Sequence, residues 1–270
     1  MKEDKKFTVL DFMRKKESGE KITMLTAYDY PMASLIDRAG IDSVLVGDSL
    51  GMVVLGREST VSVTMDEMIH HAKAVRRGVK RAFLIGDMPF MSYQASDEDA
   101  VRNAGRFIKE SGCDAVKIEG GREICSRASA IIKVGIPVLG HVGLTPQSVS
   151  KLGGYKVQGK DESSAARLAG DVKHLTKAGC FAVILECIPK TLAKKISDKA
   201  EIPVIGIGAG VACDGQVLVT YDMIGYFDKF VPKFVKQYAD ISGTIFEAIR
   251  KFKLDIESGD FPDDEHSFTP

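Results

Sequence analysis

The sequence contains no tryptophan and no long hydrophobic run, and its charges cancel. Lys plus Arg and Asp plus Glu each total 37, so nothing in the net charge indicates a nucleic-acid or membrane partner. No stretch approaches the roughly 18 apolar residues that a membrane-spanning helix needs. The opening residues, MKEDKKFTVLDF, mix both signs without an apolar segment behind them. They predict neither a signal peptide nor a transit peptide, and we expect a cytoplasmic protein.

The sequence also lacks a cysteine framework and recognisable linkers. Its five cysteines show no Cys-x-x-Cys spacing, which is typical of reduced thiols in a cytosol that serve as core residues. There is no Ser/Gly tract, Pro-rich stretch or low-complexity segment. With 270 residues, 44% of them hydrophobic, the chain can form a full core, and we predict one domain over residues 1–270.

What the chain does contain is an alternation of short apolar runs and longer helical stretches. The runs are rich in Val, Ile and Leu and nearly continuous, which is typical of parallel strands that are covered on both faces. Eight strands are predicted, at 21–29, 42–48, 81–87, 114–120, 136–144, 181–187, 202–210 and 221–227.

The stretches between these runs carry helical signals. Residues 64–79 place apolar or small side chains at helical spacing after Thr64, a suitable N-cap. Residues 96–112 begin with Ser96 and acidic residues and end at Gly112. Further helices are predicted at 8–18, 161–179, 189–200 and 233–258.

Eight strands that alternate with helices over about 250 residues are typical of a TIM barrel. The alternative is an open, doubly wound sheet. The first strand-to-helix turn lacks a Gly-x-Gly-x-x-Gly motif, and eight unbroken repeats favour closure. We therefore predict an α/β fold, a (β/α)8 barrel with the 8–18 helix across one end.

Polar residues occupy the carboxyl ends of five consecutive predicted strands, where TIM barrels carry their chemistry. Two strands end in Gly-Asp, at Asp48 and Asp87, and the glycine is expected to allow a tight turn. Lys117 and Glu119 are two positions apart and therefore on one side of their strand. The set is completed by Ser49, His141 and Glu186. Any one of these residues is most simply a helix cap or a loop residue, but caps do not explain five successive strands.

The acidic residues predict a metal site. Neighbouring carboxylates raise one another's pKa, and a bound cation removes that repulsion. Oxygen ligands without Cys or paired His favour Mg²⁺, followed by Mn²⁺. We predict that Asp48, Asp87 and Glu119 hold Mg²⁺, partly through water. Open positions on such a metal would chelate the carboxylate and ketone of an α-keto acid and stabilise an enolate.

The remaining polar residues suit the same chemistry. Lys117 can neutralise a substrate carboxylate or enolate, and Ser49 can donate a hydrogen bond. Glu186, outside the metal set, is free to act as a base at the carbon next to the ketone. His141 either orients or donates to the substrate, or is a satisfied, partly buried histidine.

Two glycine-rich segments have alternative interpretations. GIGAG (206–210) follows the seventh predicted strand, where many barrels bind phosphate, although tight packing of the strand against its loop is simpler. KLGGYKVQGK (151–160) is either a mobile lid over the rim or a long surface loop, and we favour the lid.

Eight motifs resemble the ketopantoate hydroxymethyltransferase family. In chain order they are VGDSLGM, VTMDEMIHHAKAVRRG, DMPFMSY, VKIEGG, GHVGLTPQS, GGYKVQG, LECIP and IPVIGIGAG. The resemblance extends from about residue 7 to the EHSF near the end. It implies a TIM barrel of the phosphoenolpyruvate/pyruvate superfamily, Mg²⁺, and a homodecamer of two pentamers. It also implies one-carbon transfer from 5,10-methylenetetrahydrofolate to 3-methyl-2-oxobutanoate, giving 2-dehydropantoate for pantothenate and coenzyme A synthesis.

The resemblance also implies roles for individual residues. Metal ligands are implied at Asp48, Asp87 and Glu119, the last either directly or through water. Ketoacid contacts are implied at Ser49, Asp87 and Lys117. His141 resembles a residue that either faces the substrate or supports those that do, and we predict that it and Asp48 also take part in substrate binding. Glu186 resembles the family's proton acceptor. No departure is seen at these positions, whereas 221–235 is less diagnostic and leaves the shape of that rim loop open.

Two other functions stay open at this point. Another Mg²⁺-dependent 2-oxoacid barrel enzyme, a lyase or mutase, would use the same groups without folate. A catalytically idle scaffold would be expected to lack at least one of the acids, and all are present. Because the chain has no tryptophan, the residues that contact the pterin are not assigned.

Overall fold

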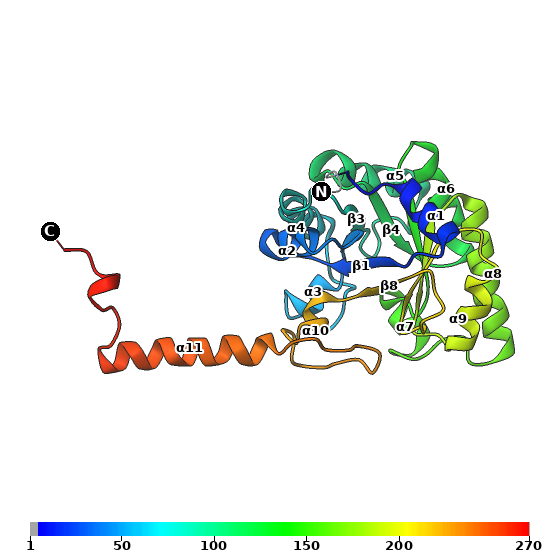
Figure 1. Cartoon of the computed structure of the whole chain (residues 1–270). Coiled ribbons are helices and arrows are strands. Elements are labelled where there is room, and N and C mark those ends of the chain that lie inside the picture. Colours follow the sequence, from blue (N-terminus) through cyan, green and yellow to red (C-terminus); the bar gives the residue numbers. More distant parts are fainter. Residues whose placement is uncertain (1–4, 270) are drawn as a thin grey trace. The chain divides into compact units, whose positions relative to one another are not determined.

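The computed structural model describes residues 5–269 and contains a closed barrel of eight parallel strands in chain order (Figure 1). Contacts divide the chain into one compact unit that ends at Val219 and a second that begins at Thr220. The barrel confirms the predicted fold. The prediction of a single domain over 1–270 stays a prediction, and residues 1–4 and 270 lie outside the described part.

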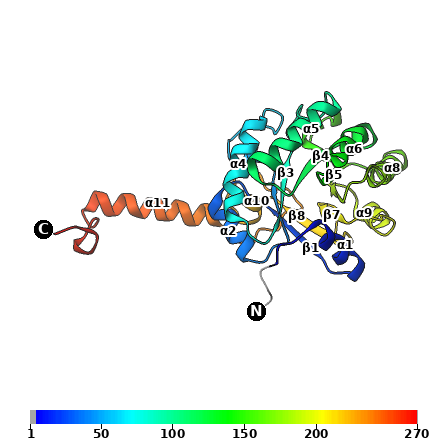
Figure 2. The ribbon, with the colours of Figure 1, turned by 90° about the horizontal axis from the view of Figure 1, so that it is seen from above.

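Helices surround the strands of the first unit, and Figure 2 shows α4, α5, α6, α8 and α9 outside the ring of strands. The strands are β1 (Ile22–Thr26), β2 (Ser43–Val46), β3 (Phe83–Asp87), β4 (Ala115–Glu119), β5 (Val138–Gly143), β6 (Ala182–Glu186), β7 (Val204–Ile207) and β8 (Gly215–Leu218). The α-helices are α1 (Val9–Ser18), α2 (Tyr30–Arg38), α3 (Leu50–Val53), α4 (Met65–Gly78), α5 (Asp97–Arg106), α6 (Cys125–Lys133), α7 (Val149–Leu152), α8 (Glu162–Ala178) and α9 (Lys190–Ser197). Shorter helical turns are η1 (Phe107–Ser111), η2 (Arg122–Ile124) and η3 (Pro146–Ser148). The first seven predicted strands are confirmed.

The predicted eighth strand at 221–227 is wrong. The barrel closes through Gly215–Leu218, which pairs with β1, whereas Thr220–Met223 form the helix α10. Only alternate residues of β8 are buried, and Gln216 is exposed, so this strand does not form a continuous apolar run. The aromatic and aliphatic residues of 221–227 imitate such a run, although Tyr221 and Asp222 are helical.

Helix α1 covers the amino-terminal end of the barrel, as predicted. Phe12 is fully buried and contacts Phe83 and Phe181 edge to face, at centroid distances of 5.4 and 5.1 Å. Phe83 begins β3 and Phe181 precedes β6, so the helix spans several strand beginnings. The Lys16 ammonium lies 2.7 Å from the carboxylate of Asp214, just before β8.

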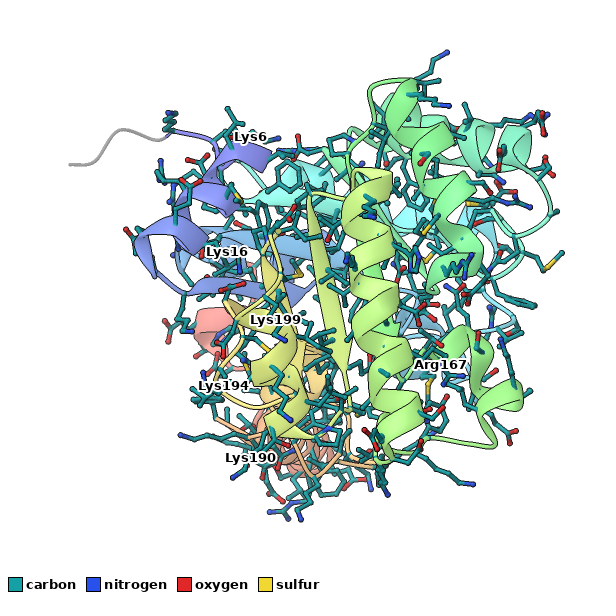
Figure 3. All side chains as sticks on the ribbon, turned by 90° about the vertical axis from the view of Figure 1, so that its right-hand side faces the viewer. Lys6, Lys16, Arg167, Lys190, Lys194 and Lys199 are labelled. Carbon is teal, nitrogen blue, oxygen red and sulfur yellow. The ribbon has the colours of Figure 1, made fainter. Side chains whose placement is uncertain are left out.

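The outer faces of α8 and α9 are charged. Figure 3 shows Arg167 on α8 and Lys190 and Lys194 on α9 at the surface that faces the viewer. Lys194 is 62% exposed and lies 2.8 Å from Asp198, whereas Ala193 of the same helix is buried. This division into a polar and an apolar face is what a helix on the outside of a barrel requires.

The start of α4 provides a test of local stability. Thr64 is the predicted N-cap: its hydroxyl accepts from the Glu67 backbone N–H, and Glu67 accepts from the Thr64 N–H at 2.8 Å. The hydrogen bond from Arg57, followed by that from Thr64, lowers the pKa of Glu67 from 4.5 to about 2. Glu67 therefore stabilises the fold above pH 4.5, and this contribution is lost as the pH falls towards 2.

Glu67→Gln is expected to lower the free energy of unfolding by about 1 kcal/mol at pH 7, since it removes the carboxylate charge that pairs with Arg57 and accepts from the Thr64 backbone N–H. The difference from the parent chain should shrink between pH 4.5 and 2. Urea unfolding at pH 7, 5 and 3.5 measures both effects. Glu20→Gln, at an exposed position, is the matched control and should leave the midpoint unchanged. A pH-independent difference would contradict the electrostatic part of the argument.

The second unit contains α10 (Thr220–Met223), α11 (Ile241–Ser258) and η4 (Asp264–His266). The predicted 233–258 helix begins later than expected, because Asp240 caps α11 by accepting from the Gly243 N–H at 2.9 Å. Helix α11 exposes large apolar side chains, among them Phe246, Ile249 and Phe252. Within residues 5–269, no helix combines the length and apolarity needed to cross a membrane.

Candidate active site

Strand register brings the predicted polar side chains together at the carboxyl end of the barrel. Asp87 on β3 is aligned with Lys117 on β4, and Glu119 on β4 is aligned with His141 on β5. Aligned residues of parallel strands face the same side of a sheet, so each pair is adjacent. None of these four side chains belongs to a residue that is more than 5% exposed.

The five residues form a chain of alternating charges. Lys117 Nζ lies 2.8 Å from Asp87 Oδ1 and 3.2 Å from Glu119 Oε1. His141 Nδ1 lies 3.3 Å from Glu119 Oε1, and His141 Nε2 lies 3.1 Å from Glu186 Oε2. His141 therefore lies between Glu119 and Glu186, with a carboxylate oxygen within 3.3 Å of each ring nitrogen, although its buried Nε2 makes no hydrogen bond of good geometry.

Glu186 is the most accessible of the three acids in this series of alternating charges. Its side chain is 16% exposed, against 2% for Asp87 and Glu119. The backbone around it is fixed by close packing, because a Cβ at Gly143 would lie 2.2 Å from the Glu186 carbonyl oxygen. Cys187, directly after it, has a positive φ of 47° and so turns the chain sharply at the end of β6.

Asp48 and Ser49 lie at the turn between β2 and α3. The Asp48 backbone N–H donates to Asp87 Oδ2 at 3.0 Å, which joins the two Gly-Asp strand ends. Asp48 is 4% exposed. Ser49 Oγ lies 2.8 Å from the Tyr28 hydroxyl. Asp48 is thus linked directly to Asp87 and, through Asp87, to Lys117 on β4, whereas Ser49 contacts Tyr28.

The glycines before Asp48 and Asp87 are explained by close packing and not by the expected tight turn. Neither Gly47 nor Gly86 is among the glycines with a positive φ. A Cβ at Gly86 would lie 2.3 Å from the ring of Phe107, and one at Gly47 would lie 2.8 Å from Ser49 Oγ. Close approach of neighbouring groups, rather than turn geometry, therefore opposes a side chain at Gly86, and at Gly47 a side chain would require the Ser49 hydroxyl to move.

Two residues that the sequence did not indicate complete the network. Gln147, in η3, donates through Nε2 to Asp48 Oδ2 at 2.9 Å and through its backbone N–H to Glu119 Oε2 at 3.1 Å. The Tyr93 hydroxyl lies 2.9 Å from Gln147 Oε1 and accepts from the Glu119 N–H at 2.9 Å. Both lie in rim loops, inside the motifs GHVGLTPQS and DMPFMSY, but residue type alone gave them no role.

Burial and mutual repulsion act on the carboxylates. Burial, with the nearby charges of Asp87 and Glu119, raises the pKa of Asp48 well above its ordinary value. Burial also raises the pKa of Asp87, although Lys117 opposes the shift. Glu119 shows the opposite balance: burial is outweighed by Lys117 and His141, which lower its pKa to about 2.

The two cationic side chains are held in their charged forms. Burial disfavours the Lys117 ammonium, but Asp87 and Glu119 keep its pKa well above the ordinary value. Burial and Lys117 also act against the His141 imidazolium, yet hydrogen bonds to Glu119 and Glu186 raise the pKa of His141 to about 9. With four carboxylates and two cations, the fully ionised site carries an excess of negative charge.

The donor set fits a divalent cation of the Mg²⁺ type. Asp48, Asp87 and Glu119 offer carboxylate oxygens, and the excess negative charge matches a divalent cation. In the described residues, no three His, Cys, Asp or Glu side chains form a ready-made metal cage. Mg²⁺ does not need such a cage, because it retains several waters and takes one or two protein carboxylates. The ligand roles of the three acids stay a prediction.

The structure supports one of the two interpretations for the glycine-rich segment 206–210 and leaves both open for 151–160. A Cβ at Gly206 would lie 2.9 Å from Cys213 Sγ, which supports the packing interpretation of GIGAG. The 151–160 segment approaches the site's surroundings at two points. The Tyr155 hydroxyl lies 3.7 Å from Sδ of Met52 in α3, and the Gln158 N–H donates to the Cys187 carbonyl at 2.9 Å. Its function as a lid stays a prediction.

Comparisons with known proteins agree with this geometry. A protein 58% identical over 262 residues, covering 97% of this chain and 95% of its own, is the 3-methyl-2-oxobutanoate hydroxymethyltransferase of Carboxydothermus hydrogenoformans. Among solved structures, 2,3-dimethylmalate lyase, of the PEP mutase/isocitrate lyase superfamily, has a TM-score of 0.59 at 17% identity and covers 97% of this chain and 91% of its own. Phosphonopyruvate hydrolase, solved with oxalate and Mg²⁺, has a TM-score of 0.63 at 11% identity and covers 96% and 92%. At these identities, the two structures show the shared fold alone.

The family model described as ketopantoate hydroxymethyltransferase matches residues 6–264, nearly the whole chain. The barrel, the rim network and the sequence relationship therefore agree, and the chain belongs to the ketopantoate hydroxymethyltransferase family of enzymes.

Proposed function

We propose that this chain transfers a hydroxymethyl unit from 5,10-methylenetetrahydrofolate to 3-methyl-2-oxobutanoate. The product would be 2-dehydropantoate, for pantothenate and coenzyme A synthesis. The observation that carries the proposal is the buried chain of alternating charges at the barrel's carboxyl end, which terminates in the more accessible Glu186. The name of the Carboxydothermus hydrogenoformans relative supports the choice of ketoacid.

A divalent cation belongs to this proposal. Asp48, Asp87 and Glu119 would hold Mg²⁺ between them, partly through water. When bound, Mg²⁺ supplies Lewis-acid polarisation of the substrate carbonyl. Phosphonopyruvate hydrolase, which shares the fold, was solved in complex with oxalate and Mg²⁺, and this supports the proposal of Mg²⁺ together with a small anionic ligand.

The protein's own residues are proposed to remove a proton from the substrate, to orient the base and to bind the ketoacid. Glu186 takes the proton from C3 of the ketoacid, since it is the most open carboxylate of the charge chain. His141 orients Glu186 through its 3.1 Å contact and thereby also contributes to substrate binding. Lys117 balances the negative charge of the ketoacid, and Ser49 donates a hydrogen bond to it. The new hydroxyl oxygen comes from water, because the methylene donor carries none.

The assembly and location follow the family resemblance. We propose a cytoplasmic homodecamer of two pentamers. The exposed side chains of Phe246, Ile249 and Phe252 on α11 support association with further copies of the chain, since contiguous apolar faces mark interaction surfaces.

The first test is deuterium uptake at C3 of 3-methyl-2-oxobutanoate in D₂O, followed by proton NMR before any folate is added. Loss of the C3 proton signal is expected with Mg²⁺ and is expected to stop with EDTA. Addition of 5,10-methylenetetrahydrofolate should then yield 2-dehydropantoate. Exchange without this product would favour a Mg²⁺-dependent 2-oxoacid lyase or mutase. Ketoacid binding without exchange would favour an idle scaffold.

A further inference from the structure

The side-chain amide of Gln147 is held by four polar contacts. Its Nε2 donates to Asp48 Oδ2 and to the Met88 carbonyl, each at 2.9 Å. Its Oε1 lies 2.9 Å from the Tyr93 hydroxyl and 3.1 Å from Gln94 Nε2. Gln147 is only 5% exposed. All hydrogen-bonding positions of this amide are therefore occupied inside the protein.

The contacts also fix which way the amide points. The Met88 carbonyl is solely an acceptor, so the atom that faces it must be the Nε2 donor. The same nitrogen then presents its second hydrogen to Asp48 Oδ2. A rotation of the amide by 180° would set two oxygens against each other at both places. Asp48 is consequently an obligatory acceptor at Oδ2, with Oδ1 left for another partner.

Gln147 reaches Glu119 by two further routes. Its backbone N–H donates to Glu119 Oε2 at 3.1 Å. Through Oε1 it contacts the Tyr93 hydroxyl, which accepts from the Glu119 N–H and lies 3.0 Å from the Glu119 carbonyl. Burial raises the pKa of Tyr93 well above its usual value, so this hydroxyl keeps its proton. One residue thus connects the carboxylates that follow β2 and end β4.

We propose that Gln147 is a positioning residue that holds Asp48 and Glu119 in the arrangement that binds the divalent cation. The inference rests on the proposed function, because that function supplies the cation. Gln147 does not contact the metal; it fixes the direction of one oxygen on each acid. Asp48 Oδ1 is left to the cation or its waters, whereas Glu119 Oε1 also lies within 3.3 Å of Lys117 Nζ and His141 Nδ1. Groups that orient metal ligands in this way typically change metal affinity 10- to 100-fold when they are removed.

The test is the affinity for Mn²⁺, followed by the decrease of the free Mn²⁺ electron paramagnetic resonance signal. Gln147→Met keeps the length of the side chain and removes all four amide contacts. We expect the dissociation constant for Mn²⁺ to rise about 10- to 100-fold. Gln94→Met is the matched control, since Gln94 contacts the same Gln147 oxygen but no carboxylate of the site. It should leave Mn²⁺ affinity within about twofold of the parent chain.

The coupling to Asp48 provides a second readout. Asp48→Asn weakens Mn²⁺ binding on its own, and adding Gln147→Met should weaken it by much less than in the parent chain, because the two act on one ligand. If Gln147→Met does not fold, Gln147→Asn withdraws the amide while retaining its chemistry, and the same loss is expected.

The outcomes separate this inference from the proposed function. Failure of the unsubstituted protein to bind Mn²⁺ or Mg²⁺ would overturn the metal part of the proposed function. Normal Mn²⁺ binding by the parent and by Gln147→Met alike, even with a lower melting temperature in the variant, would overturn the role of Gln147 alone.

Discussion

Glu186→Gln is expected to lower kcat by roughly 10²-fold or more while ketoacid binding is retained, the usual magnitude for removal of a general base. Glutamine has the same length as glutamate, and its amide oxygen can still accept from His141 Nε2, which lies 3.1 Å from Glu186 Oε2. Geometry is therefore largely preserved, whereas the ability to accept a proton is lost. Steady-state kinetics and ketoacid titration measure the two effects separately.

The Glu186→Gln variant is also expected to be slow in the exchange of the C3 proton that occurs without folate. Metal-dependent deuterium uptake at C3 should fall together with kcat, because both require removal of the same proton. Glu201→Gln, at an exposed position outside the site, is the matched control and should exchange at the parent rate. Full activity in Glu186→Gln would eliminate this residue as the proton acceptor, and loss of ketoacid binding would indicate a substrate contact instead.

The barrel could be predicted because its strands are buried on both faces. Every residue of β2 and β3 is buried, and both strands appear in the sequence as nearly continuous apolar runs that end at or shortly before an aspartate, whereas Lys117 interrupts the equally buried β4. Strand β8 could not be found in this way. Its exposed Gln216 interrupts the run, and its pairing with β7 and with β1, which is far away in the sequence, makes it a strand.

The charged members of the site could be predicted from spacing. Lys117 and Glu119 are two apart on a strand, so they had to share a face, and the structure places their charged groups 3.2 Å apart. Gln147 and Tyr93 could not be predicted, because a glutamine or tyrosine in a loop is normally solvated. Their role arises from the tertiary fold, which brings the loops after β3 and β5 against the acids after β2 and on β4.

Lys117→Met is expected to lower kcat/KM by about 10³-fold and the free energy of unfolding by about 3–5 kcal/mol. The activity estimate corresponds to the loss of one preorganised electrostatic partner. The stability estimate corresponds to breaking a buried ion pair by removing one member. Lys117 Nζ lies 2.8 Å from Asp87 and 3.2 Å from Glu119, and both acids would be left buried without this cation. Urea unfolding and steady-state kinetics measure the two losses.

Magnesium distinguishes this explanation from a simple packing defect. With the ammonium removed, a divalent cation becomes the main compensation for Asp87 and Glu119, so Mg²⁺ should raise the melting temperature of Lys117→Met more than that of the parent chain. Lys194→Met is the matched control: Lys194 is 62% exposed and its pair with Asp198 should contribute at most about 1 kcal/mol, without a response to Mg²⁺. A Lys117→Met protein destabilised equally with and without Mg²⁺ would show that the methionine packs poorly and that the acids at the ends of β3 and β4 do not share a cation. Restoration by Mg²⁺ would show that the lysine and the metal compensate the same buried charge.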